Sequence, residues 1–167
     1  MLLKPDIKLD RITDITYDLL TKFSINALLL DVDNTMSTHH GMVLTDGLTK
    51  WLEDMKKSGI KLCILSNSKK KRVEPFAEKI GLDFISLGLK PLPSGFIRGA
   101  KRLGEKRCNI AIVGDQIFTD TLGGNLSGLK TILLTPIKPE SSLRFRFKRK
   151  LEKLVYKIYK IKKYGEE

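Results

Sequence analysis

The chain has 167 residues, of which 41% are hydrophobic and 30% charged, a composition that is typical of a globular domain and excludes a disordered or fibrous chain. Lys and Arg outnumber Asp and Glu by 31 to 19, and the resulting net charge of +12 favours an anionic partner such as a phosphorylated substrate, nucleic acid or acidic lipid. No stretch approaches the ~18 apolar residues that span a bilayer, and the N-terminus lacks the order of a secretion signal, so we expect a cytoplasmic protein. Cys63 and Cys108 show no CxxC spacing, and we expect both to be buried free thiols.

Short apolar segments alternate with segments of helical pattern. The strand candidates are residues 27–31, 60–65, 84–87, 110–113 and 131–134. The helix candidates between them are residues 46–58, 69–80, 94–103 and 119–126. Strands separated by helices indicate βαβ units, so we predict an α/β fold in which helices cover both faces of a parallel sheet.

Polar residues follow four of the strand candidates. The first strand ends in Asp31-Val32-Asp33-Asn34-Thr35, the second in Ser66-Asn67-Ser68 and the fourth in Gly114-Asp115, and Lys90-Pro91 follows the third. In an open parallel sheet, ligands bind outside the carboxyl ends of the strands. We therefore expect these four segments to face one another.

Asp31 and Asp33 are one residue apart, so both point to the same side of a strand. Two ionised carboxylates about 4 Å apart repel by roughly 4 kcal/mol at an effective dielectric near 20, and a cation would relieve that repulsion. A polar turn with Asp33 or Asn34 as a helix cap is the alternative. In the functional interpretation, Asp31 attacks phosphorus to form an aspartyl phosphate, and Asp33 protonates the leaving oxygen and then activates water.

Ser66 and Asn67 precede a helix candidate, where the Ser66 hydroxyl and the amide groups beyond it can hold phosphate oxygens. A simple N-cap serine is the alternative. Lys90 offers a compact positive charge for the phosphoryl group and the nucleophile, whereas most lysines lie on the surface without such a role. We assign these three residues to phosphate binding.

The segment Gly114-Asp115-Gln116-Ile117-Phe118-Thr119-Asp120 supplies a glycine for close backbone approach and two carboxylates. Hard oxygen ligands around a phosphate suit Mg²⁺. Asp31, the Asp33 carbonyl and Asp115 are the expected direct ligands, and Asp120 is expected one step further from the ion. A helix cap beside Thr119 is the alternative for Asp120.

In this order the four segments resemble the motifs of the haloacid dehalogenase superfamily. Within it the chain is most similar to the compact class III (subfamily IIIA) phosphatases of the YqeG-like group, which is related to mitochondrial phosphatidylglycerophosphate phosphatase. The resemblance runs from Leu3 to about Pro136. It implies a Rossmannoid three-layer fold, Mg²⁺ dependence and the roles given above. The segment from Met36 to His40 departs from the more apolar stretch that is typical after the first motif.

The motif spacing limits the substrate. Thirty residues separate Thr35 from Ser66 and 23 separate Ser66 from Lys90, so neither gap can hold a separate cap domain. A site without a lid favours lipid headgroups or macromolecules over small sugars, unless a neighbouring copy supplies a lid. His39 and His40 lie on the loop after the first motif, where they either touch a leaving group or are exposed without function.

We expect a phosphatase domain at residues 1–137 and a basic extension at residues 138–167, which contains 11 Lys and Arg against 4 Asp and Glu. Its apolar residues follow 4-3-4-3 spacing: Phe147, Leu151, Leu154, Ile158 and Ile161. The pattern predicts an amphipathic basic helix that docks on its own domain, lies on the inner face of an anionic membrane, associates with itself or contacts nucleic acid.

We therefore expect a Mg²⁺-dependent phosphomonoester hydrolase, with phosphatidylglycerophosphate at the membrane surface as its leading substrate. A soluble phosphometabolite or a nucleic-acid end is the alternative substrate. A basic RNA- or membrane-binding module with the same fold is the alternative function.

Overall fold

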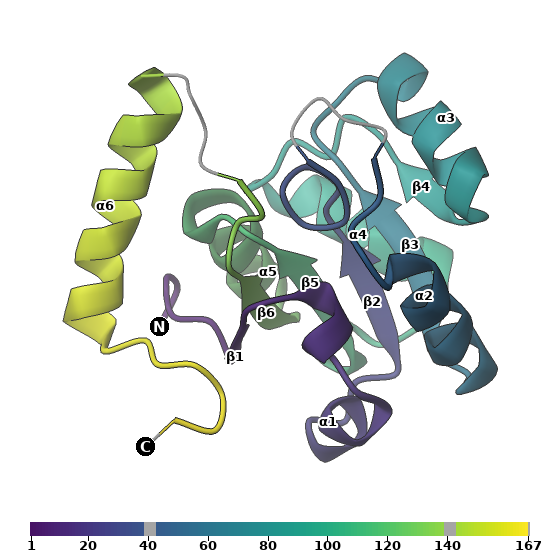
Figure 1. Cartoon of the computed structure of the whole chain (residues 1–167), viewed down its shortest axis with the longest axis horizontal. Helices are drawn as coiled ribbons and strands as arrows, with labels where there is room; N and C mark the ends of the chain where they lie inside the picture. The colour runs from purple at the N-terminus through teal and green to yellow at the C-terminus, as the bar shows by residue number, and fades with distance from the viewer. Residues whose placement is uncertain (39–42, 139–142, 167) are drawn as a thin grey trace.

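A computed structural model of the chain describes residues 1–38, 43–138 and 143–166 (Figure 1). Its centre is a six-stranded sheet in which every pairing is parallel, in the order β1-β6-β5-β2-β3-β4. The strands are β1 (Ile7–Leu9), β2 (Ala27–Leu30), β3 (Lys61–Leu65), β4 (Asp83–Ile85), β5 (Ile110–Gly114) and β6 (Lys130–Leu134). The predicted α/β class with a parallel sheet is confirmed.

Helices cover both faces of the sheet, as Figure 1 shows. They are α1 (Tyr17–Lys22), α2 (Leu48–Lys57), α3 (Lys70–Ile80), α4 (Pro93–Leu103), α5 (Leu122–Ser127) and α6 (Leu143–Tyr159), with shorter helical turns η1 (Ile12–Asp14), η2 (Arg107–Asn109) and η3 (Ile117–Thr121). Strand β2 shows why its sequence is a continuous apolar run. Leu28 and Leu30 pack in the core beneath α1, α2 and α3, whereas Ala27 and Leu29 pack on the side of α4.

The strand order reverses direction between β2 and β5. The chain continues from β2 to β3 and β4 on one side, and from β5 to β6 on the other. Leu30 lies opposite Val113, and the Asp31 amide donates to the Val113 carbonyl at 2.9 Å. The residues that follow β2 and β5 therefore emerge side by side at the switch point of the sheet.

The five predicted strands and the four predicted helices are present, with small differences at their ends. Strand β1 and helix α1 were not predicted. Cys63 is buried as expected, but the prediction of a buried Cys108 is wrong, because Cys108 lies in the exposed turn η2 rather than in the neighbouring strand. The described residues between the motif segments form loops, single α-helices and strands of the central sheet, and contain no separate cap domain.

The predicted C-terminal helix is present as α6, but most of its apolar stripe stays exposed instead of being buried against the domain. Four residues form an outer stripe with exposed fractions of 40% to 66%: Phe147, Leu151, Leu154 and Ile158. Val155 instead packs against Ile117 and Leu133, and Tyr156 and Tyr159 join that cluster. None of the helices in the described residues combines the length and apolar composition needed to cross a membrane.

Candidate active site

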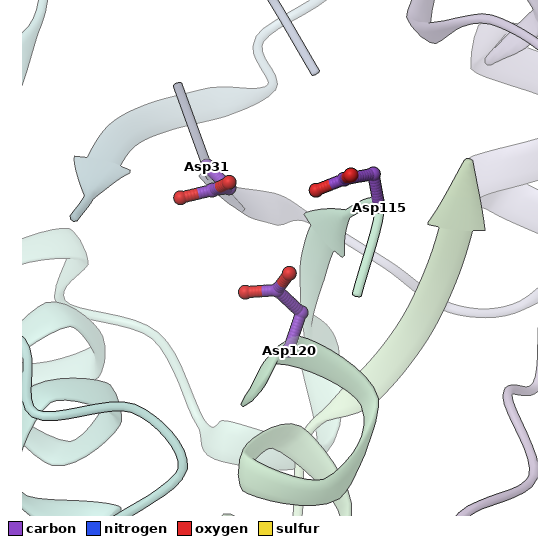
Figure 2. Close-up of side chains that lie close together, drawn as sticks. All are labelled: Asp31, Asp115 and Asp120. Atoms are coloured by element: carbon purple, nitrogen blue, oxygen red, sulfur yellow. The ribbon is translucent and has the colours of Figure 1, made fainter. Parts of the chain in front are cut away.

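The polar segments that follow the strands meet at the carboxyl edge of the sheet. Asp31 follows β2, Asp115 follows β5, and Asp120 lies in η3. Figure 2 shows the three carboxyl groups pointing toward one another, and one ligand oxygen from each lies within 4.8 Å of the others. All three residues are buried. Three carboxylates that converge in a buried position need a counter-charge.

Lys90 supplies part of that charge. Its Nζ donates to Asp31 Oδ1 at 2.6 Å and to Asp120 Oδ1 at 2.7 Å, and its side chain is only 3% exposed. The Asn67 side chain holds the Lys90 backbone, because Asn67 Oδ1 accepts from Lys90 N at 2.7 Å and Asn67 Nδ2 donates to Lys90 O at 3.1 Å. Asn67 thus positions Lys90, and direct phosphate binding by Asn67 stays a prediction.

The Asp33 side chain is bonded to α3 and lines the same cavity as Asp31. Arg72 Nη2 donates to Asp33 Oδ1 at 2.6 Å, and Arg72 Nη1 donates to Ser68 Oγ at 3.1 Å. Ser66 is buried, and its Oγ accepts from Ser68 N at 3.1 Å. Of the basic run at residues 69–72, Arg72 is the member that contacts the site.

The capping alternatives do not match the helix starts. The N-cap of α3 is Lys69, so Ser66 does not cap this helix. The helix that follows the first motif is α2, and its N-cap is Gly47 rather than Asp33 or Asn34. These polar residues therefore have no capping role that would explain their presence.

The Asp120 carboxyl group lies close to the backbone of Gly114 at the end of β5. Its Oδ2 accepts from Gln116 N at 3.2 Å, which resembles a cap of η3. A Cβ at Gly114 would lie 2.3 Å from the carboxyl carbon of Asp120. The close backbone approach that we predicted for Gly114 is thus present, and no larger residue fits there without displacing Asp120.

Burial changes the ionisation of the cluster. It raises the pKa of Asp31 to about 7, against the opposing charge of Lys90 and with the help of Asp120. Burial also raises the pKa of Asp115 to about 8, although Arg149 opposes the shift. Burial alone would lower the pKa of Lys90, but the Asp120 and Asp31 carboxylates outweigh it and raise that pKa.

The donor set fits a hard divalent cation. Asp115 Oδ1 is buried, and no hydrogen-bond partner for it is found in the part of the chain that the structure describes. Oxygen ligands alone make up the cluster, as Mg²⁺ prefers. A bound cation would satisfy that oxygen and favour the ionised form of Asp31 and Asp115.

The sequence analysis missed Arg149, which reaches Asp115 from α6. Arg149 Nη2 pairs with Asp115 Oδ2, and Arg149 Nη1 donates to Asp115 O and to Glu152 Oε2, both at 2.7 Å. Glu152 Oε1 in turn accepts from Ile117 N at 2.8 Å. Glu152 is the only acidic residue in α6, and this isolated carboxylate three residues after an arginine was the signal available in the sequence.

A cavity of about 610 Å³ opens above Asp31 and Lys90. Asp33, Ser66 and Arg72 also line it, and α6 contributes Phe147, Lys148 and Leu151. The C-terminal helix therefore forms a wall of the site. His39 and His40, which we considered for this region, lie outside the described residues.

Residues 16–128 match the family model of haloacid dehalogenase-like hydrolases. The chain belongs to the haloacid dehalogenase-like hydrolase family. This hydrolase is also 34% identical over 158 residues to a Bacillus subtilis (strain 168) protein described as probable phosphatase YqeG, a match that covers 95% of the chain and 92% of the relative. The resemblance to the superfamily and to its YqeG-like group is confirmed.

Solved structures share the fold of this hydrolase at low sequence identity. A possible sugar phosphatase from Cytophaga hutchinsonii has a TM-score of 0.64 and 13% identity, covering 93% of this chain and 96% of that one. A HAD family hydrolase from Deinococcus radiodurans R1, with bound phosphate and sodium, has a TM-score of 0.59 and 15% identity, and the match covers 76% of this chain and 88% of that one. An uncharacterised protein from Listeria monocytogenes has a TM-score of 0.58 and 20% identity, covering 82% and 100%.

Proposed function

We propose that the protein is a Mg²⁺-dependent phosphomonoester hydrolase that works through an aspartyl phosphate. The observation that carries the proposal is the convergence of Asp31, Asp115 and Asp120 within 4.8 Å, with Lys90 bonded to two of them. The family and the probable phosphatase relative support the same chemistry.

In the proposed reaction, a carboxylate oxygen of Asp31 attacks phosphorus and the ester oxygen leaves. Asp33 donates a proton to that leaving oxygen, then takes a proton from the water that attacks the aspartyl phosphate. This second step releases inorganic phosphate and restores Asp31. Asp31, Asp115 and the Asp33 carbonyl would hold Mg²⁺, with Asp120 one step further away, and the ion would offset negative charge on the nucleophile and the phosphate.

The other residues of the site position these groups. Lys90 orients Asp31 through the 2.6 Å bond, and Arg72 holds the Asp33 carboxylate near the mouth of the cavity. The Ser66 hydroxyl and the amide groups that follow it are the proposed ligands of the phosphate oxygens.

Replacing Asp31 with asparagine tests the reaction. We expect phosphate release to fall by about 10⁴-fold or more, because the amide is not a nucleophile, while the thermal unfolding profile stays cooperative. Asp54→Asn on the exposed surface of α2 is the matched control and should keep full activity. Addition of EDTA to the unmodified enzyme should abolish turnover, and excess Mg²⁺ should restore it. Full activity in Asp31→Asn ends the proposal.

We further propose that the enzyme acts at a membrane surface, with phosphatidylglycerophosphate as its leading substrate. The support is the absence of a cap domain among the described residues and the exposed outer stripe of α6 next to the cavity. Exposed Lys150, Lys153 and Lys157 flank that stripe, and apolar residues among lysines suit an anionic lipid surface.

A phosphate-release screen and vesicle binding test this second proposal. We expect phosphatidylglycerophosphate to be preferred over lysophospholipid, sugar phosphate and nucleotide substrates, and phosphatidylglycerol vesicles to bind more strongly than phosphatidylcholine vesicles. Leu154→Ser with Ile158→Ser should weaken vesicle binding without loss of activity on a soluble aryl phosphate. A preferred soluble metabolite or nucleic-acid end would replace the lipid substrate. RNA affinity that falls steeply with salt, without hydrolysis of any phosphomonoester, would favour a binding module.

A further inference from the structure

The wall that α6 contributes to the cavity combines one lysine with two apolar side chains. Phe147, Lys148 and Leu151 face the same 610 Å³ space as Asp31 and Lys90. Arg149 and Glu152 fix this wall to the end of β5 and to η3 through the bonds to Asp115 and Ile117. A substrate bound at Asp31 therefore meets α6 with the part that lies beyond the reacting phosphate.

Lys148 differs from the other cations of the cavity. Lys90 is bonded to Asp31 and Asp120, and Arg72 is bonded to Asp33. Lys148 Nζ donates to the neutral Gln116 Oε1, and among the described residues it forms no ion pair with a carboxylate. An ammonium group has three donors, so hydrogen-bonding capacity remains at this position.

The surroundings of Lys148 favour an incoming anion. The side chain is half-buried, and the nearby carboxylates of Glu152, Asp120 and Asp115 offset only part of the desolvation, which lowers the pKa of Lys148. Phe147 and Leu151, which lie one residue before and three residues after it, present apolar surface to the same cavity. The wall thus offers one positive charge next to apolar contacts.

We propose that Lys148 binds a second anionic group on the leaving group of the substrate. The chemical class is a phosphomonoester whose alcohol carries its own phosphate or carboxylate, with Phe147 and Leu151 in contact with its carbon atoms. This inference rests on the proposed phosphatase function and makes Lys148 a determinant of specificity. It gives α6 the recognition role that a cap domain has in larger hydrolases.

Kinetics with two soluble substrates test the inference. 4-Nitrophenyl phosphate has a leaving group without a second charge, and glycerol 1,3-bisphosphate has one with a phosphate. For Lys148→Met we expect kcat/KM on the bisphosphate to fall about 10- to 100-fold, mainly through KM, because a hydrogen bond between two charged groups is lost. Activity on 4-nitrophenyl phosphate should change less than about twofold. Lys148→Arg should restore part of the preference.

Lys101→Met is the matched control, because it removes the same charge from an exposed position of α4, outside the cavity and the outer stripe. It should leave the preference between the two substrates unchanged. Equal losses on both substrates, or no loss on either, overturn the role of Lys148 while leaving the phosphatase proposal intact. An unmodified enzyme that hydrolyses neither of them, nor phosphatidylglycerophosphate, overturns both. Phosphatidylglycerophosphate in detergent micelles, as a third substrate, distinguishes a lipid source of the second anion from a soluble one.

Discussion

Replacing Lys90 with methionine removes the cation that lies between the Asp31 and Asp120 carboxylates. The ligand oxygens of the cluster lie within 4.8 Å of one another, and two unit charges at that separation repel by about 3.5 kcal/mol at an effective dielectric of 20. Loss of one partner from a buried ion pair typically costs about 3–5 kcal/mol. We therefore expect the free energy of unfolding of the metal-free protein to fall by about 3–5 kcal/mol at pH 8.

The free energy of unfolding lost in Lys90→Met should be larger at pH 8 than at pH 5.5. Burial raises the pKa of Asp31 to about 7, so Asp31 is mostly ionised at pH 8 and mostly protonated at pH 5.5. A protonated carboxyl group needs no counter-charge, and the cost of removing Lys90 should therefore be smaller at pH 5.5. Urea denaturation in EDTA, followed by the fluorescence of the buried single tryptophan Trp51, measures both values.

Lys50→Met provides the control, because Lys50 pairs with Asp54 on the exposed surface of α2. Such an exposed pair contributes little to stability, because water screens both charges. If Lys90→Met costs no more than this control at pH 8, or costs the same at both pH values, the electrostatic account of the cluster is refuted.

Three further outcomes are expected. Gly114→Ala should abolish Mg²⁺ binding in calorimetry, because its Cβ would lie 2.3 Å from the carboxyl carbon of Asp120; unchanged binding would contradict the geometry. Val155→Ala should lower the free energy of unfolding by about 1–3 kcal/mol, whereas Leu154→Ala, on the exposed face of α6, should change it by less than about 0.5 kcal/mol in urea denaturation. Mg²⁺ affinity should rise between pH 6 and pH 8.5, because burial raises the pKa of Asp115 to about 8 and the bound ion must displace that proton. Calorimetry in two buffers should detect the released proton. A Mg²⁺ affinity that does not change with pH would contradict the raised pKa of Asp115.

Much of the sheet and the position of its site were predictable from local sequence. Strands β2 and β5 are buried on both faces, so they appear as apolar runs that stop abruptly at Asp31 and Asp115. The parallel arrangement then places these endings at one edge. Strand β1 was missed because three residues, with Lys8 between Ile7 and Leu9, are too short for a periodic pattern, and its pairing with β6 at the other end of the chain is a tertiary contact.

The buried face of α6 was not predictable from periodicity. The regular spacing of the outer stripe favoured burial of that side, but α6 buries the neighbouring face, where Arg149 pairs with Asp115 and Glu152 accepts from Ile117 N. Those contacts depend on partners that are distant in sequence. Contacts of charged residues thus set the orientation of α6, although the apolar pattern of its sequence indicated a different orientation.

The bond between Arg149 and Asp115 has a consequence for the order in which the enzyme becomes complete. A ribosome adds Asp31, Lys90 and Asp115 to the nascent chain before it adds Arg149. Until α6 emerges, Asp115 is without its guanidinium partner, and the wall that carries Lys148 has not yet been made. We therefore expect that hydrolytic competence appears only once translation has passed α6, so that prematurely terminated chains are inactive.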